Sequence, residues 1–330
     1  MRWARRILLG VLGLIVLALL AGVVYEAVSR ASDEKRFRPP GQLVDVGGHR
    51  IHIHCTGSGS PTVVLEAGLG LTALLWRAVQ PGIAAFTTVC SYDRAGYGYS
   101  DPGPLPRTVE RRVDDLRAAL RGAGRPPPYV LVGHSAGGLA ARSFQHRFPG
   151  EVVGVVLVDS SHEDQFVRAP PSLAAGMRAE GSQAEVAAAL QPLGVTRLLL
   201  AFIARQAGVP QDLADEYVAL SVRRPYLEAV RSETDQLLGR KDVPPGVTLG
   251  ELPLVVLTAG KAGELDLPPA DAAAFRRLWV EELQPELARL SSRSRQVTVE
   301  GSGHLIPMEE PGAVVEAVRQ VVDEIRARRD

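Results

Sequence analysis

A serine stands between two glycines in the segment Gly133-His134-Ser135-Ala136-Gly137, directly after the strand-like letters YVLV. A serine hydroxyl is a weak nucleophile unless a neighbouring base takes its proton. On a sharp turn between a strand and a helix, the hydroxyl is held at the edge of the sheet, and the crowded positions two before and two after it must be glycine. The pattern therefore predicts a nucleophilic Ser135. Its simplest alternative is a tight turn with an incidental serine.

The elements that must position this serine alternate along the chain. Strand-like runs read PTVVLEAG, TTVCSYD, YVLVGH and VVGVVLVD, and later LPLVVLTAG and RQVTVEG, with helical patterns between most of them. Continuous β-branched runs separated by helices predict a parallel sheet that is covered on both faces. We assign this core to residues 41–162 and 251–330.

The strand pattern stops between these two parts of the core. Residues 163–250 are rich in Ala, Leu, Arg and Glu at helical spacing, as in VTRLLLAFIARQAG. We interpret this segment as a helical cap over one end of the sheet, because it follows the carboxyl end of a strand and ligands bind at that edge of open α/β sheets. Peripheral decoration is the alternative.

The N-terminus differs in kind from the rest. Arg2, Arg5 and Arg6 precede Ile7–Tyr25, a run without charge whose helix would rise about 28 Å, close to the hydrocarbon thickness of a bilayer. Positive charge before the run predicts a cytoplasmic N-terminus and an exported domain. We expect residues 1–25 to form a retained membrane anchor and residues 26–40 a linker. A cleaved signal peptide, which would leave a secreted domain, is the competing interpretation.

With these elements placed, the chain resembles the α/β-hydrolase superfamily over residues 43–327. The matching motifs occur in the family's order: VVLEAGLG, SYDRAGYGYSD, the Ser135 turn, VVGVVLVDS, the helical cap and GSGHLIPMEEP. The resemblance implies a mostly parallel eight-stranded sheet flanked by helices, with the cap inserted after strand six. It also implies Ser135 as nucleophile, His304 as general base, and the backbone N–H groups of Ala136 and Leu69 as the oxyanion hole. An imidazole suits the role of base because it titrates near neutral pH.

The acid of the expected triad is the point where the sequence departs from the family pattern. Most members place an aspartate about three residues beyond the glycine that ends strand seven, and here that position is Gly263. The other family location, the end of strand six, supplies Asp159, a rigid mount for a carboxylate. A helix cap is the alternative role for Asp159. Asp266 and Glu264 remain the other candidate acids.

The resemblance also implies that the two cysteines of the chain pair with each other. In this fold the second strand lies beside the fourth, and Cys55 ends the former while Cys90 lies in the latter. Cα atoms on adjacent strands lie within disulfide range, and export favours oxidation. We expect a Cys55–Cys90 disulfide, with two buried free thiols as the alternative.

The composition and motifs restrict the function. Lys+Arg and Asp+Glu both number 37, so no basic field predicts a nucleic-acid partner. We expect no metal and no organic cofactor, and a small ester-like molecule as substrate. The resemblance leaves two rivals: a peptidase of the proline-iminopeptidase kind, which would need an acidic cluster in the cap, and a non-catalytic ligand-binding member. Epoxide hydrolases and haloalkane dehalogenases of this fold use an aspartate nucleophile, and Ser135 argues against both.

Overall fold

The computed structural model describes residues 2–206, 211–239, 246–261 and 266–328. Its centre is an eight-stranded sheet in the order β1-β2-β4-β3-β5-β6-β7-β8. The first two pairings, β1 with β2 and β2 with β4, are antiparallel, and all the others are parallel. The strands are β1 (Gln42–Asp45), β2 (Arg50–Thr56), β3 (Thr62–Glu66), β4 (Val89–Tyr92), β5 (Tyr129–His134), β6 (Val152–Val158), β7 (Leu254–Ala259) and β8 (Ser294–Val299).

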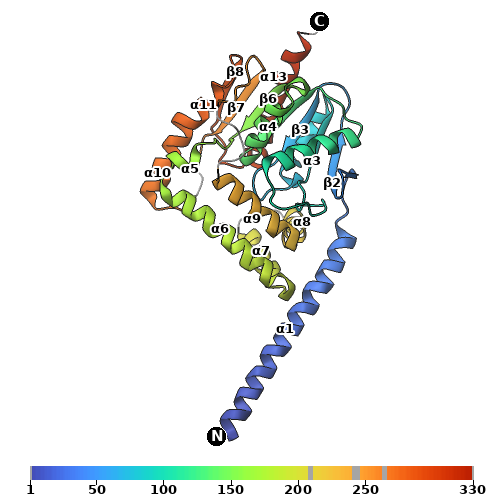
Figure 1. Cartoon of the computed structure of the whole chain (residues 1–330), viewed down its shortest axis with the longest axis vertical. Helices are drawn as coiled ribbons and strands as arrows, with labels where there is room; N and C mark the ends of the chain where they lie inside the picture. The colour runs from blue at the N-terminus through green and yellow to red at the C-terminus, as the bar shows by residue number, and fades with distance from the viewer. Residues whose placement is uncertain (1, 207–210, 240–245, 262–265, 329–330) are drawn as a thin grey trace.

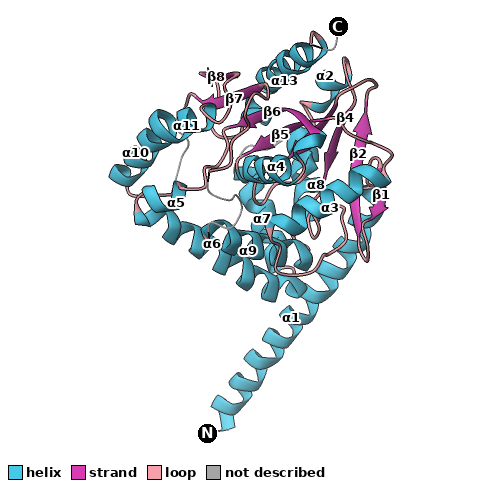
Figure 2. Ribbon diagram, turned by 45° about the horizontal axis from the view of Figure 1, so that its top comes forward, coloured by secondary structure: helices cyan, strands magenta, loops and turns pink. Residues whose placement is uncertain are grey.

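Helices cover both faces of this sheet, as the continuous apolar strands require (Figure 2). On one face, side chains of α3 (Val109–Gly122), α4 (Ala136–Arg147) and α11 (Gln284–Ala288) pack into a buried apolar cluster. On the other, η1 (Ala73–Trp76), α2 (Gln80–Ala84) and α13 (Pro311–Arg326) do the same. Shorter elements are η2 (Pro149–Glu151), α10 (Pro269–Arg277), the π-helix η4 (Leu278–Leu283) and α12 (Ile306–Glu309).

The predicted helical insert lies between β6 and β7. It contains α5 (Gln165–Arg168), α6 (Pro171–Leu190), η3 (Gln191–Leu193), α7 (Val195–Gln206), α8 (Gln211–Ser221) and α9 (Arg224–Leu238). Helices α6 and α9 pack against each other, and in Figure 1 they lie beneath the carboxyl ends of the strands. The fold class predicted from the sequence is confirmed.

The N-terminal apolar run forms part of one long helix, α1 (Arg2–Arg36), which projects away from the domain (Figure 1). It is long and apolar enough to span a membrane. The helix also continues through most of the segment 26–40, where we expected a linker. This segment contains good helix formers and no proline before Pro39, and its last turns pack against the cap instead of hanging free.

The strand order brings the two cysteines together. Cys55 on β2 is the register partner of Cys90 on β4, and the two residues are joined by a disulfide with their Cα atoms 4.0 Å apart. The predicted disulfide is therefore present, and it forms because β2 lies beside β4 as predicted. It ties the antiparallel edge of the sheet to its parallel centre.

Candidate active site

Ser135 occupies the turn between β5 and α4 with a φ of 52° and a ψ of −127°. A non-glycine residue adopts a positive φ only when its surroundings hold it there. The backbone N–H of Ser135 donates to the carbonyl of Val158, 3.1 Å away, and its own carbonyl accepts from Gly138 and Ser161. These bonds fix the serine at the carboxyl edge of the sheet, beside the end of β6.

The two flanking glycines are required by close backbone packing. A Cβ built on Gly133 would lie 2.6 Å from the carbonyl oxygen of Gly137, and one built on Gly137 would lie 2.5 Å from the carbonyl oxygen of Glu66. Real Cβ atoms do not approach backbone atoms this closely. The local pattern read from the sequence therefore has the steric cause that we assigned to it.

His304 and Asp159 meet at the same edge. His304 lies in the loop that follows β8, and Asp159 directly follows β6. His304 Nδ1 lies 2.6 Å from Asp159 Oδ2, and the Asp159 side chain is buried while that of His304 is 45% exposed. Asp159 also has a positive φ, of 40°. The structure thus brings together the two side chains that the sequence placed 145 residues apart.

The second oxygen of Asp159 is held by two further donors. The backbone N–H of Ala259 and the indole N–H of Trp279 both donate to Asp159 Oδ1, each at 3.0 Å. Burial acts to raise the pKa of Asp159, but the bonds from His304, Ala259 and Trp279 outweigh it and hold the pKa below its ordinary value. The carboxylate is therefore ionised and oriented at neutral pH.

Sequence reasoning missed Trp279. It lies in the π-helix η4, an irregularity that frequently marks functional sites. Its only signal in the sequence is a tryptophan between Leu278 and Val280, in a helical segment far from any motif. Nothing in that pattern indicates that the indole reaches Asp159.

His134, next to Ser135, is fully buried and contacts the backbone of His304. Its Nε2 lies 2.9 Å from the backbone carbonyl of His304, so Nε2 carries the proton and donates. Burial, with the nearby His304 ring, lowers the pKa of His134 to about 3, so this side chain is neutral at physiological pH. His134 therefore packs in the turn and anchors the loop that carries His304.

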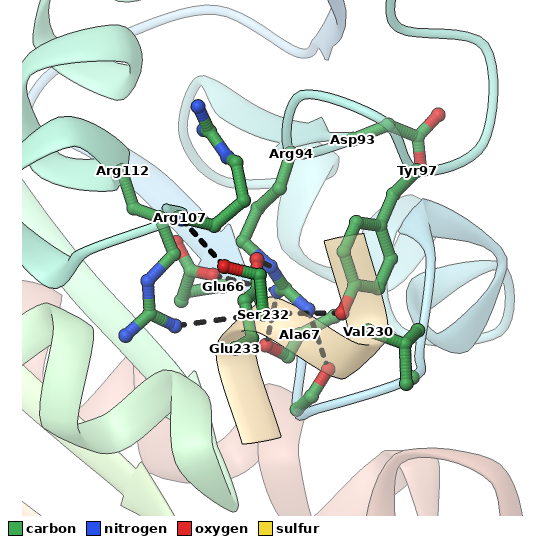
Figure 3. Close-up of polar contacts among 12 residues, drawn as sticks. Glu66, Ala67, Asp93, Arg94, Tyr97, Arg107, Arg112, Val230, Ser232 and Glu233 are labelled. Atoms are coloured by element: carbon green, nitrogen blue, oxygen red, sulfur yellow. Dashed lines mark hydrogen bonds and ion pairs between the residues drawn. The ribbon is translucent and has the colours of Figure 1, made fainter. Parts of the chain in front are cut away.

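The loop after β3 carries Leu69 and runs close to Ser135. A Cβ built on Gly68 would lie 3.0 Å from the Ser135 Cβ. The buried guanidinium of Arg94 holds this loop: Nη1 donates to the carbonyl of Ala67 at 2.6 Å and Nη2 to the carbonyl of Gly68 at 2.8 Å (Figure 3). The Gly68 carbonyl shares a peptide plane with the Leu69 N–H, so Arg94 sets the direction of that N–H.

Arg94 also links this loop to the cap. It makes a buried ion pair with Glu66 at the end of β3, 2.9 Å, and another with Glu233 on α9, 3.2 Å (Figure 3). Glu233 in turn accepts from the Tyr97 hydroxyl at 3.1 Å, and Arg112 lies 3.7 Å from it. A buried charged network therefore fastens the cap helix to the segment that borders the serine.

Asp266, the second candidate acid, does not lie at His304 Nδ1. Asp266 is exposed, and it faces Glu180 on α6; burial, together with the charge of Asp266, raises the pKa of Glu180. Glu264 lies outside the described residues. Of the two candidate acids that the structure describes, Asp159 is the one that it brings to the histidine.

A cavity of about 720 Å³ opens over these residues, between the core and the cap, which is the size typical of small-molecule sites. Leu69, Ser135, Ala136, Asp159 and His304 all line it. Its remaining described wall is largely apolar and comes from α5, α6, α9, α10 and η4, with Phe166, Leu173, Met177, Val230, Leu237, Phe275 and Trp279 among its members. No cluster of three metal-binding side chains occurs among the residues that the structure describes.

Comparison with known proteins assigns the family. Residues 63–317 match the family model described as "Alpha/beta hydrolase family". A protein named "Probable transporter efuK" from Hormonema carpetanum is 29% identical over 87% of this chain and 43% of its own length. A mouse protein named "(Lyso)-N-acylphosphatidylethanolamine lipase" is 24% identical over 79% of this chain and 80% of its own length. The chain spans less than half the length of the first two curated relatives, 43% and 48%.

Solved structures share the fold at low sequence identity. A thermophilic esterase from Thermogutta terrifontis superimposes with a TM-score of 0.60 and 21% identity, over 86% of this chain and 98% of its own. Other structures of this fold are the epoxide hydrolase CorEH and the enol-lactonase from Burkholderia xenovorans. At these identities the likeness establishes the fold alone.

Proposed function

The chain belongs to the alpha/beta hydrolase family, and from this premise we propose that it is a serine hydrolase acting on carboxylic esters through an acyl-enzyme intermediate. The observation that carries the proposal is the 2.6 Å contact between His304 Nδ1 and the buried Asp159, in the cavity that Ser135 also lines. The relatives named as an esterase and a lipase are consistent with this class.

The proposed first half-reaction transfers the acyl group to the serine. Asp159 accepts the Nδ1–H bond, so the lone pair of His304 is on Nε2, the atom that removes the hydroxyl proton of Ser135. Ser135 Oγ then attacks the ester carbonyl carbon. The N–H groups of Leu69 and Ala136 stabilise the negative oxygen of the tetrahedral intermediate. When the C–O bond of the ester breaks, the alcohol leaves with the proton held by His304.

The second half-reaction repeats these steps with water. His304 Nε2 removes a proton from water, the hydroxide attacks the acyl-enzyme, and the carboxylic acid leaves as Ser135 recovers its proton. Asp159 stays ionised throughout and stabilises the imidazolium that forms twice in the cycle. Arg94 contributes by keeping the Gly68–Leu69 peptide in one orientation.

The wall of the cavity favours an apolar acyl or alcohol group. Its described acidic members are Asp159 and Glu180, whereas Lys261, Arg276 and Arg277 are basic. A peptidase of the proline-iminopeptidase kind would need a group of acids to bind a free amine, so this wall argues for an ester. The aspartate nucleophile of epoxide hydrolases has no counterpart at Ser135.

We further propose that α1 anchors the enzyme in a membrane with the catalytic domain on the extracytoplasmic side. The apolar run of α1 and the arginines that precede it support this orientation. Cleavage of α1 as a signal peptide would instead release the domain. Protease digestion of membrane vesicles of known orientation, followed by detection of the intact domain, distinguishes the two sides.

The test of the function is hydrolysis of a panel of p-nitrophenyl esters of increasing chain length by the full-length chain in detergent. We expect turnover, and a loss of about 10³-fold or more in kcat for Ser135→Ala and for His304→Ala, because the two groups act as a unit. Binding of esters to a folded protein without turnover would favour the non-catalytic ligand-binding member instead.

A further inference from the structure

Helix α7 exposes an apolar stripe that is unusual on a protein surface. Val195, Leu198, Leu199, Phe202 and Ile203 are each 45–59% exposed, and their spacing places them on one side of the helix. The opposite side, with Ala204 and partly with Leu200 and Ala201, packs against α8. Large contiguous apolar patches mark interaction sites. We refer to these five residues as the α7 stripe.

The start of α7 is fastened to the N-terminal helix. Gly22 of α1 lies against the carbonyl of Leu193, and a Cβ on Gly194 would lie 2.7 Å from the Tyr25 ring. Within α7, the buried guanidinium of Arg197 makes ion pairs with Glu26 and Asp33 of α1, at 2.8 and 2.7 Å. The position of α7 relative to α1 is therefore set by packing and by charge.

This attachment fixes the level of α7 along α1. The apolar run of α1 ends at Tyr25, and the first charge after it, Glu26, is buried against Arg197. If the run spans a bilayer, the membrane surface lies near Tyr25, which is also where α7 begins. Helix α7 lies on the side of the domain from which the free part of α1 projects (Figure 1).

We propose that the α7 stripe is embedded in the interface of the lipid bilayer that α1 spans, so that the cap as well as the anchor binds the membrane. An interfacial helix buries its apolar face about 5–10 Å into the boundary between headgroups and acyl chains. The exposed Arg205 at the end of α7 is suited to contact lipid phosphates. The inference rests on the proposed anchoring role of α1.

The test uses the full-length chain in phosphatidylcholine nanodiscs, with a bimane fluorophore on a single introduced cysteine. The native cysteines are joined in a disulfide and do not compete for the label. With lipids brominated on the acyl chains, bimane on Phe202→Cys is expected to lose more than about half of its emission, because the probe lies at the acyl boundary. The matched control is Val297→Cys on β8, which is 44% exposed and should keep its emission.

A third variant separates this inference from the anchoring of α1. Leu14→Cys lies within the apolar run, and strong quenching there reports a spanning α1. Quenching at position 14 combined with equal, weak quenching at positions 202 and 297 would overturn the role of the α7 stripe alone. Absence of quenching at position 14 would contradict the anchor itself. Shielding of position 202 from both brominated lipid and aqueous iodide would mean that a second copy covers the stripe, which also overturns the proposal.

Discussion

In the described part of the chain, two residues other than glycine have a strained backbone, and the side chains of both can do chemistry. Ser135 and Asp159 are the non-glycine residues with positive φ, at 52° and 40°. Such conformations cost about 1–3 kcal/mol each and persist where the surrounding structure holds them. Here the hydrogen bonds of Ser135 to the end of β6 and of Asp159 to β7 do so. This strain is one reason to treat both residues as parts of a single site.

Trp279→Phe tests how the carboxylate of Asp159 is positioned. The change removes the indole N–H that donates to Asp159 Oδ1 but keeps an aromatic ring in the cavity wall. A hydrogen bond to a charged group is worth about 1.5–3 kcal/mol, so kcat/KM for a good ester is expected to fall about tenfold to a hundredfold. Trp76→Phe is the matched control, because the buried Trp76 N–H has no partner among the described residues. Equal activity of the two variants would contradict the positioning role.

Gly137→Ala tests the steric account of the turn. The new methyl group would lie 2.5 Å from the carbonyl oxygen of Glu66 and 2.8 Å from that of Ala67, closer than real Cβ atoms approach backbone atoms. We expect a loss of several kcal/mol in stability, seen as a much lower Tm or as insoluble protein. Gly150→Ala, at a glycine with open space around it, should leave Tm within a few degrees of the wild type. A normal Tm for Gly137→Ala would refute the crowding argument.

At the residue scale, the sequence predicts those features that depend on neighbours in the chain. The glycines around Ser135 and the loop carrying His304 are such features. The choice among Asp159, Asp266 and Glu264 depends on distances across the sheet, so the sequence left it open. The roles of Trp279, Arg94 and the neutral His134 arise from contacts between distant segments, for which no local pattern exists.

Buried ion pairs join the elements around the site. The pair that Glu163 makes can be tested through the pH dependence of stability. It lies after β6 and pairs with the buried Arg142 of α4 at 2.7 Å. Burial acts to raise the pKa of Glu163, but the bond to Arg142 prevails and lowers it to about 2. A depressed pKa gives stability that is fully present above the unfolded value of about 4.5 and is lost as pH falls toward 2.

Glu163→Gln is therefore expected to destabilise the chain by roughly 3 kcal/mol at neutral pH. Thermal unfolding of the wild type and the variant in detergent, from pH 7 downward, measures the difference in Tm. The difference should hold to about pH 4.5 and shrink below it. A difference that vanished already near pH 6 would assign the stabilisation to another group.

Glu233→Gln tests the link between the cap and the loop that carries Leu69. The change removes the negative charge that lies beside the buried Arg94 and Arg112. Breaking a buried ion pair lowers the stability of a protein by about 3–5 kcal/mol. We expect a lower Tm and a lower kcat, because the Gly68–Leu69 peptide is less firmly held. Glu228→Gln on the same helix breaks only an exposed pair with Arg224 and should cost about 0.5 kcal/mol or less. Similar effects of the two changes would argue against a special role for the network.

At the element scale, periodicity predicted the strands and the cap, but one segment departed from expectation and one irregular helix was not foreseen. The segment 26–40 has the composition of a linker, yet it is helical to Arg36. Its Glu26 and Asp33 pair with Arg197 of the cap, which lies 171 and 164 residues away in sequence. The π-helix that carries Trp279 differs from an ordinary helix by its hydrogen-bond spacing. Residue types do not encode that spacing.

On the scale of the whole molecule, the disulfide ties the antiparallel edge of the sheet to its parallel centre. The Cys55–Cys90 bridge closes a segment with a separation of 35 residues, and its removal in Cys55→Ala/Cys90→Ala is expected to cost about 2–4 kcal/mol, measured as a lower Tm. A thiol assay of the denatured, unreduced wild type should detect no free thiol. Two free thiols per chain would contradict the bridge.

The central claim is that Ser135 is an activated nucleophile, and labelling by a fluorophosphonate probe tests it most directly. The full-length chain in detergent should be labelled covalently, and both Ser135→Ala and His304→Ala should abolish labelling while their Tm values stay near that of the wild type. A folded wild type that remains unlabelled, or labelling that survives in Ser135→Ala, would contradict the account.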